Sequence, residues 1–173
     1  MISKELSATL GFAVREAKKR RHEYVSVEHV LFAILHDSSG LEIVEKCGGN
    51  VENIKANLEI FFNDNIEMLP EESEYVLQQT IGFQRVIQRA VNHVRSAEKK
   101  EVAVSDILAS IFMEKESHAV YFLNEEGISR LDVLRNISHE LPTGISDDVS
   151  ETDAPSEQKT IKKKSSPLDA YTV

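Results

Sequence analysis

Residues Val25–Leu35 read VSVEHVLFAIL, and the same apolar pattern returns seventy-seven positions later as VAVSDILASIF in Val102–Phe112. At this offset the apolar residues coincide, while the polar residues between them differ. The match extends on both sides through small and apolar pairs, namely Ala13 with Ala90, Val14 with Val91, Ala17 with Val94, Val51 with Ile128 and Ile54 with Leu131. A repeated apolar skeleton predicts one packing unit used twice.

Apolar residues at helical spacing predict four helices in the first repeat. The first helix is expected over Ser3–Arg21, and Ser26 is placed to cap the second helix. After a turn at Asp37–Gly40, a short third helix is expected to stop at Gly48–Gly49. Asn50 is then placed to cap the fourth helix.

The second repeat follows the same plan. Its expected inward-facing residues are Phe83, Val86, Ala90, Val94 and Ala97, then Val104, Ile107, Leu108, Ile111 and Phe112, then Ala119, Phe122 and Leu123, and finally Leu131, Leu134 and Ile137. No convincing run of alternating residues predicts a strand. The predicted fold is therefore all-α, with eight helices arranged as two pseudo-twofold-related four-helix repeats.

One position departs from the repeat. Ala103 stands where the first repeat has Ser26, so the sixth helix lacks a hydroxyl cap. The loss of such a cap typically costs about 1 kcal/mol, unless Ser105 begins the helix two residues later.

Composition restricts the class of protein. The chain has 173 residues and a formal net charge of −9, which argues against nucleic acid as a partner. Cys47 is the only cysteine, so no intrachain disulfide can form. No apolar run approaches the roughly 18 residues of a membrane span, and the N-terminus lacks the apolar region of a signal peptide. We therefore expect a cytoplasmic protein without a membrane partner.

The chain divides by composition into three parts. Residues 1–140 are expected to form the double-repeat domain, with repeat one at about 1–62 and repeat two at about 80–140. Asn63–Gln79, which is acidic and contains Pro70, is interpreted as the loop between repeats. Residues 141–166 have the composition of a disordered linker, and residues 167–173 become apolar again.

No motif for catalysis or metal binding is convincing. The His22–Glu23 pair resembles the start of an HExxH zinc motif, but the next histidine, His29, lies seven residues on rather than four. We expect His22 to lie partly protonated near a helix end, and His29 and His36 to form a solvated stripe. Tyr121 and Cys47 are expected in the core. No GxxxxGK[ST] motif is present, so no nucleotide-binding loop, catalytic residue, metal site or cofactor is predicted for this chain.

Two segments resemble a known family. RRHEYVSVEHVLFAIL, residues 20–35, and FQRVIQRAVNHVRSAEKKEVAVSDIL, residues 83–108, are similar to the N-terminal domain of Clp-type AAA+ unfoldases, in particular the ClpA type. The resemblance covers about residues 1–140, and PLDAYTV at residues 167–173 looks like the start of the AAA+ module. It implies a helical module that docks adaptors and substrates for a hexameric ATPase ring. ATP and Mg would then belong to the parent protein, and the isolated domain would be monomeric.

The resemblance also implies a partner and a site. In ClpA-type proteins the adaptor is ClpS, which delivers N-degron substrates, and the ring feeds the Clp peptidase. The matching segments place the adaptor-binding residues at His22, Glu23, Glu28, Thr80, Gln84 and Arg85, with Arg89 beside them. Because Glu28 and His29 differ from Ser105 and Asp106 of the second repeat, we expect one acidic docking edge rather than two.

Two alternatives remain open. A ClpC- or ClpB-like relative would carry the same repeats but use other adaptors or bind unfolded segments directly. A stand-alone enzyme, such as a metal-dependent hydrolase, would need a pocket with convergent polar groups, and the sequence offers none.

Overall fold

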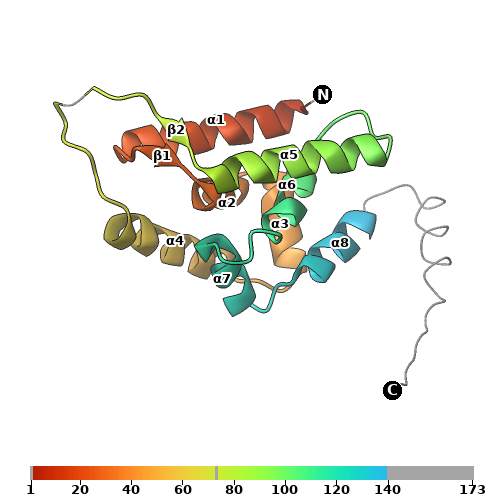
Figure 1. The fold of residues 1–173 in the computed structure, drawn as a ribbon. Helices are drawn as coiled ribbons and strands as arrows, with labels where there is room; N and C mark the ends of the chain where they lie inside the picture. The colour runs from red at the N-terminus through yellow and green to blue at the C-terminus, as the bar shows by residue number, and fades with distance from the viewer. Residues whose placement is uncertain (1, 73, 140–173) are drawn as a thin grey trace, which may run out of the picture. The chain divides into compact units, whose positions relative to one another are not determined.

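The computed structural model describes residues 2–72 and 74–139. Its first half contains α1 (Lys4–Lys19), β1 (Tyr24–Val25), α2 (Val27–Ile34), α3 (Ser38–Lys46) and α4 (Val51–Asn65). Its second half contains β2 (Gln78–Gln79), α5 (Ile81–Ser96), α6 (Val104–Ile111), α7 (His118–Glu125) and α8 (Arg130–His139). The eight helices confirm the all-α prediction (Figure 1).

The two copies of the repeated motif form the centre of the fold. All residues of α2 are buried, and in α6 only Ser105 is less than fully buried. The two helices pack on each other, α2 also packs on α1 and α7, and α6 also packs on α5 and α3. The apolar skeleton recurs because each copy occupies the inside of one shared core, where large aliphatic side chains leave the least surface in water.

The two repeats exchange backbone hydrogen bonds at their first helices. Thr80 donates its N–H to the carbonyl of Val25 over 3.2 Å, within the parallel pairing of β1 with β2. At the equivalent place Ser3 donates its N–H to Val102 over 3.0 Å, beside the bridge between Ile2 and Val102. Each pairing is too short to produce alternation in the sequence, which is why the sequence predicts no strand at these residues.

Ser26 and Asn50 are the caps of α2 and α4, as predicted, and two further hydroxyl residues cap α1 and α5. Ser3 Oγ accepts the N–H of Leu6 at 3.0 Å, and Thr80 Oγ1 accepts the N–H of Phe83 at 3.1 Å. The sixth helix begins at Val104 although Ala103 has no hydroxyl. Asp106 compensates, because its Oδ2 accepts the N–H of Ala103 at 2.8 Å. The helix therefore does not start later at Ser105.

Two boundaries differ from the predictions. Helix α3 begins inside the expected turn, because the carboxylate of Asp37 accepts the N–H groups of Ser39 and Gly40. In α8 the predicted core residue Leu131 is 55% exposed, whereas Val133 is fully buried. The cap of α4 is Asn50, and that of α8 is Ser129, seventy-nine rather than seventy-seven positions later.

The cause of this shift lies between α6 and α7. The first repeat passes from the end of α2 at Leu35 to the cap Asp37, whereas the second passes from Phe112 to the cap Ser117. This connection is three residues longer in the second repeat, and the path from the cap of the third helix to that of the fourth is one residue shorter, so the last helix shifts by two positions. Val133, rather than Leu131, therefore takes the place of Ile54.

The segment between the two repeats is shorter than predicted. Helix α4 continues to Asn65, so the loop between repeats is shorter than expected. The linker at 141–166 and the module start at 167–173 lie outside the described residues. In the part that the structure describes, no helix is both long and apolar enough to cross a bilayer.

Candidate docking site

The predicted partner-binding residues point to one edge of the fold, which we call the docking edge. It consists of Glu23, the strands β1 and β2, and the first two turns of α5 as far as Arg85. Its exposed side chains are Glu23, Tyr24, Gln78, Gln79, Ile81, Gln84 and Arg85. Tyr24 is 45% exposed and Ile81 is 69% exposed, so the edge combines apolar and polar surface.

Backbone contacts hold the docking edge together. Gln78 donates its N–H to the carbonyl of Glu23 over 3.0 Å, next to the bond from Thr80 to Val25. Thr80 then caps α5, so the helix starts directly at the strand and brings Gln84 and Arg85 to the edge. Gly82 lets α5 approach α2, because a Cβ at this position would lie 3.2 Å from Cγ2 of Val27.

Arg85 and Arg89 share one carboxylate. Arg85 binds Glu114 through two nitrogens at 3.1 and 2.6 Å, and Arg89 reaches the same carboxylate at 3.0 Å. The Glu114 side chain is only 8% exposed, whereas that of Arg85 is 57% exposed. The hydrogen bond from Arg85 is the main cause of the lowered pKa of Glu114. The pairing fixes the guanidinium of Arg85 at the surface of the docking edge.

Two of the predicted contact residues are interior. Glu28 is 7% exposed, and its Oε2 accepts the N–H groups of His118 at 2.8 Å and Ala119 at 3.2 Å. This carboxylate therefore stabilises the start of α7 and does not face a partner. His22 is 2% exposed. The expected acidic docking edge is corrected accordingly: its exposed charges are Glu23 and Arg85, of opposite sign.

The expected charge of the histidines is also corrected. Burial lowers the pKa of His22, so the ring is neutral rather than partly protonated. Burial also lowers the pKa of His29 to about 3, and this residue is fully buried rather than part of a solvated stripe. His36 is exposed as predicted, and its Nδ1 lies 2.8 Å from the carbonyl of Phe32.

Sequence reasoning missed some residues of the edge and misplaced others. Tyr24 and Ile81 were not predicted, although each is a large apolar residue next to a predicted contact residue. Tyr121 was expected in the core but is 57% exposed. Cys47 is half-buried and accepts a contact from Nδ2 of Asn136 at 3.3 Å, and burial raises the pKa of its thiol.

A shallow groove adjoins the docking edge between α1 and α5. Its apolar floor is formed by Leu10, Val14, Phe83 and Ile87, and its polar rim by Gln79, Gln84 and Gln88. Beyond Val14 and Gln79 it continues along Val25 and the segment 75–77. Amide side chains beside apolar surface suit contact with another polypeptide, because each amide both donates and accepts hydrogen bonds.

The described residues hold no group of side chains that could bind a metal ion. Across residues 2–72 and 74–139, no three histidine, cysteine, aspartate or glutamate side chains are grouped so that they could hold a metal ion. The geometry at the docking edge is that of a surface for contact, with opposite charges, amides and exposed apolar side chains.

Comparisons with known proteins agree with this architecture. Residues 1–126 match the family model of the Clp repeat (R) N-terminal domain. A ClpA homolog protein of Fuscovulum blasticum is 37% identical over 140 residues, which are 79% of this chain and 17% of that protein. The chaperone protein ClpB of Mesorhizobium japonicum is 25% identical over 115 residues, 65% of this chain and 13% of that protein.

The same fold occurs in a solved structure. The N-terminal domain of Hsp104 from Candida albicans superposes with a TM-score of 0.65 at 14% identity, over 76% of this chain and 85% of that one. At this identity the likeness shows the fold alone. The chain spans less than a fifth of the length of the two sequence relatives.

Proposed function

Because this chain belongs to the family of Clp repeat N-terminal domains, we propose that it is the adaptor- and substrate-docking domain of a ClpA-type ATP-dependent unfoldase. The adaptor would be a ClpS-like protein carrying N-degron substrates, and the parent ring would pass them to the Clp peptidase. The observation that carries this proposal is the docking edge, where exposed Glu23, Tyr24, Gln84 and Arg85 lie together on a rigid backbone.

The chemistry of the docking edge supports a protein partner. Tyrosine and arginine are enriched among residues that dominate protein interfaces. Tyr24 and Arg85 are both exposed, and Arg85 is already held by Glu114, so little side-chain entropy is lost on binding. The opposite charges of Glu23 and Arg85 would set the orientation of the partner more than its affinity.

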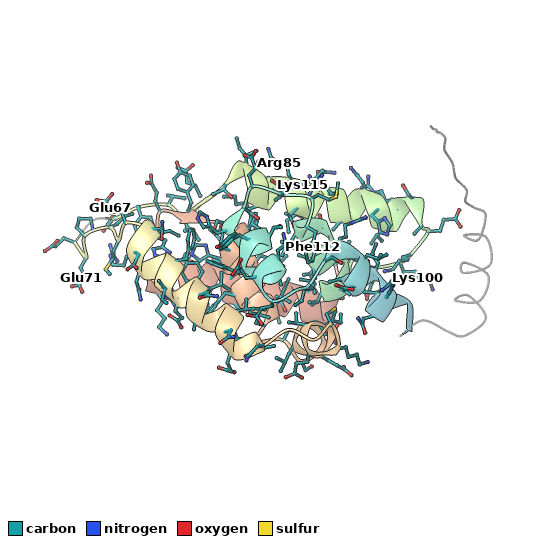
Figure 2. The ribbon with its side chains drawn as sticks, turned by 90° about the horizontal axis from the view of Figure 1, so that it is seen from below. Glu67, Glu71, Arg85, Lys100, Phe112 and Lys115 are labelled. Atoms are coloured by element: carbon teal, nitrogen blue, oxygen red, sulfur yellow. The ribbon has the colours of Figure 1, made fainter. Side chains whose placement is uncertain are left out.

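The repeat supplies a matched control for testing the edge. Glu23 corresponds to Lys100 at the offset of the repeat, and both are exposed. Figure 2 shows Arg85 near the start of α5 and Lys100 beyond its other end. A charge reversal at Lys100 therefore changes an equivalent backbone position away from the docking edge.

Calorimetric titration of the full chain with purified ClpS tests the proposal. We expect 1:1 binding that Glu23→Lys and Tyr24→Ala each weaken by about tenfold, equivalent to about 1.4 kcal/mol. Lys100→Glu should leave the affinity unchanged. The absence of heat at tens of micromolar, or equal losses at Glu23 and Lys100, would reject the proposal.

The groove between α1 and α5 favours one alternative. In a ClpB- or ClpC-like protein, an apolar groove with amides at its rim would bind unfolded segments without ClpS. An unfolded model polypeptide would then bind the full chain, and Ile87→Asp in the groove would reduce this binding while Glu23→Lys would not. If Glu23→Lys reduces the binding of the polypeptide and Ile87→Asp does not, contact is made at the docking edge, as the adaptor-docking function requires.

The wider setting of the domain belongs to the same proposal. The chain itself would not be an enzyme and would hold no cofactor, and ATP and Mg would act in the parent ATPase. The isolated domain would be a monomer in the cytoplasm, and the parent a hexamer.

A further inference from the structure

Equivalent positions of the two repeats hold two different polar pairs, a buried one in repeat one and a partly exposed one in repeat two. In repeat one, Nδ1 of His22 lies 2.9 Å from Nε2 of His29. In repeat two, at the same offset, Nζ of Lys99 lies 2.9 and 3.0 Å from the carboxylate oxygens of Asp106. The fold therefore accepts either a neutral pair or an ion pair at this place.

The two pairs make the same contact with the backbone. Nδ1 of His29 accepts the N–H of Ser26 at 3.0 Å, and Oδ2 of Asp106 accepts the N–H of Ala103 at 2.8 Å. Each pair thus ties the start of the repeat's second helix to the residue that follows its first helix.

The hydrogen bonds of the histidine pair assign its protons. Since Nδ1 of His29 accepts from Ser26, the proton of that ring is on Nε2 and is donated to Nδ1 of His22. The nearby carbonyl of Phe62 acts to raise the pKa of His22, against the larger lowering by burial. Phe62 also stacks on His29, with ring centroids 4.6 Å apart. Nδ1 of His29 also lies 2.9 Å from Oγ of Ser26, so it faces both polar groups of that residue.

The histidine pair lies directly behind the docking edge. The carbonyls of Arg21, Glu23 and Val25 accept N–H groups from Leu69, Gln78 and Thr80, respectively. His22, between Arg21 and Glu23, points inward to His29. The position of its ring therefore sets the position of the strand that carries Glu23 and Tyr24.

The charged groups around the pair disfavour an added proton. Arg20, directly after α1, lies near both rings, and it is itself held by Glu16 at 3.2 Å and by Glu59 of α4 at 2.8 Å. Asp64 and Glu67, at the end of α4 and just beyond it, line a pocket together with His22. From α2, Glu28 directs its carboxylate to the start of α7 instead. The charged group that acts on both rings is thus a cation.

We propose that the His22–His29 pair positions the docking edge and makes it sensitive to protons, whereas the Lys99–Asp106 pair keeps the equivalent edge of repeat two insensitive. An added proton turns an acceptor into a donor, so that two N–H groups face each other and the strand at residues 21–25 shifts. Lysine and aspartate keep their charges over the range in which histidines titrate. The effect on partner binding rests on the proposed function, but the effect on the strand does not.

Backbone NMR of the full chain tests the strand without any partner. We expect the amide signals of Gln78 and Thr80 to shift with the ring signals of His22 as the pH is lowered from about 7.5 to about 4.5. The amide of Ser3, which bonds to Val102, is the internal control and should not follow. If the His22 ring takes up no proton in this range, or if Gln78 and Thr80 do not move with it, the proposal is wrong.

Exchange of the pairs gives the matched variants. His22→Lys with His29→Asp should rebuild the ion pair of repeat two and remove the pH response of Thr80. Lys99→His with Asp106→His should transfer that response to Ser3. If the variant His22→Lys with His29→Asp is unfolded, the variant Lys99→His with Asp106→His still tests the proposal. The wild-type titration tests it without either variant. A response that is the same in wild type and in a folded exchange variant would overturn the proposal.

Adaptor binding separates this inference from the proposed function. If both hold, ClpS affinity in wild type should fall by about twofold by the pH at which the His22 ring is half protonated, and it should stay constant over the same range in the double variant His22→Lys with His29→Asp. If Thr80 follows the rings but ClpS does not bind, the positioning role stands and the proposed function fails. If ClpS binds equally at both pH values while the rings titrate, the proton sensitivity of docking is refuted.

Discussion

Glu28 of α2 accepts the backbone N–H of His118, ninety residues later, over 2.8 Å. A carboxylate from one repeat thereby caps a helix of the other. The backbone makes a similar exchange. Ser3, before α1, donates to Val102, before α6, and Thr80, before α5, donates to Val25, before α2. The two repeats form one cooperative structure, and the docking edge is built from both.

Removal of the Glu28 carboxylate should destabilise the whole domain. Glu28→Ala leaves the N–H groups of His118 and Ala119 without their acceptor at a buried helix start, and we expect a loss of about 1–3 kcal/mol. Urea denaturation measures this loss. The exposed Glu23→Ala should change the free energy of unfolding by less than about 0.5 kcal/mol. Equal effects of the two variants would contradict the role given to Glu28.

Mild acid should destabilise the fold through His29. Its pKa is about 3 in the folded state against 6.5 for an unperturbed ring, so below pH 6.5 the unfolded chain binds a proton that the folded chain does not. The free energy of unfolding should therefore fall with falling pH, by about 1.4 kcal/mol per pH unit well below pH 6.5. The lowered pKa of His22 acts in the same direction.

Urea denaturation between about pH 6.5 and pH 5 checks this dependence, because few carboxylates titrate there. The exposed His93→Gln should keep the slope, and His22→Lys with His29→Asp should reduce it. A wild-type stability that is constant over this interval would disprove the assignment of a buried neutral pair.

A hydroxyl at residue 103 should stabilise α6. Ala103 is the cap of α6 and has no side-chain oxygen, while Thr80 and Ser117 accept N–H groups at the starts of α5 and α7. Ala103→Ser should raise the free energy of unfolding by about 0.5–1 kcal/mol. Thermal denaturation measures the change. No change or a decrease would mean that a hydroxyl at residue 103 finds no N–H group to accept at this helix start.

The register of α8 can be tested with two truncations. Val133→Ala removes buried methyl groups and should cost about 1–3 kcal/mol, whereas Leu131→Ala, at a residue that is 55% exposed, should cost less than about 0.5 kcal/mol. Urea denaturation of both variants provides the comparison. The reverse order would restore the register that the sequence offset predicts.

The sequence predicted the parts of the fold that depend on local spacing. The helices around Val30 and Ile107 follow from apolar residues at helical intervals, and caps such as Asn50 follow from short-range hydrogen bonding. Leu131 was misplaced because the register of α8 depends on a connection before α7 whose length carries no apolar signal.

The interior polar pairs could not be predicted in the same way. Histidine is common both at surfaces and inside proteins, and only the positions of Ser26 and Phe62 show that His29 is buried with its bonds satisfied. Glu28 appeared to be a surface charge because its partner lies in another helix. Tyr24 was missed because a strand of two residues has no detectable alternation.

Mapping of the ClpS interface on the full chain by amide chemical shifts is the most direct test of the docking edge. We predict perturbations at residues 23–25 and 80–85, with none at the equivalent positions 100–102 and 3–8. Perturbations that instead centre on the second set, or on α4 and α7, would contradict the assignment of the docking edge.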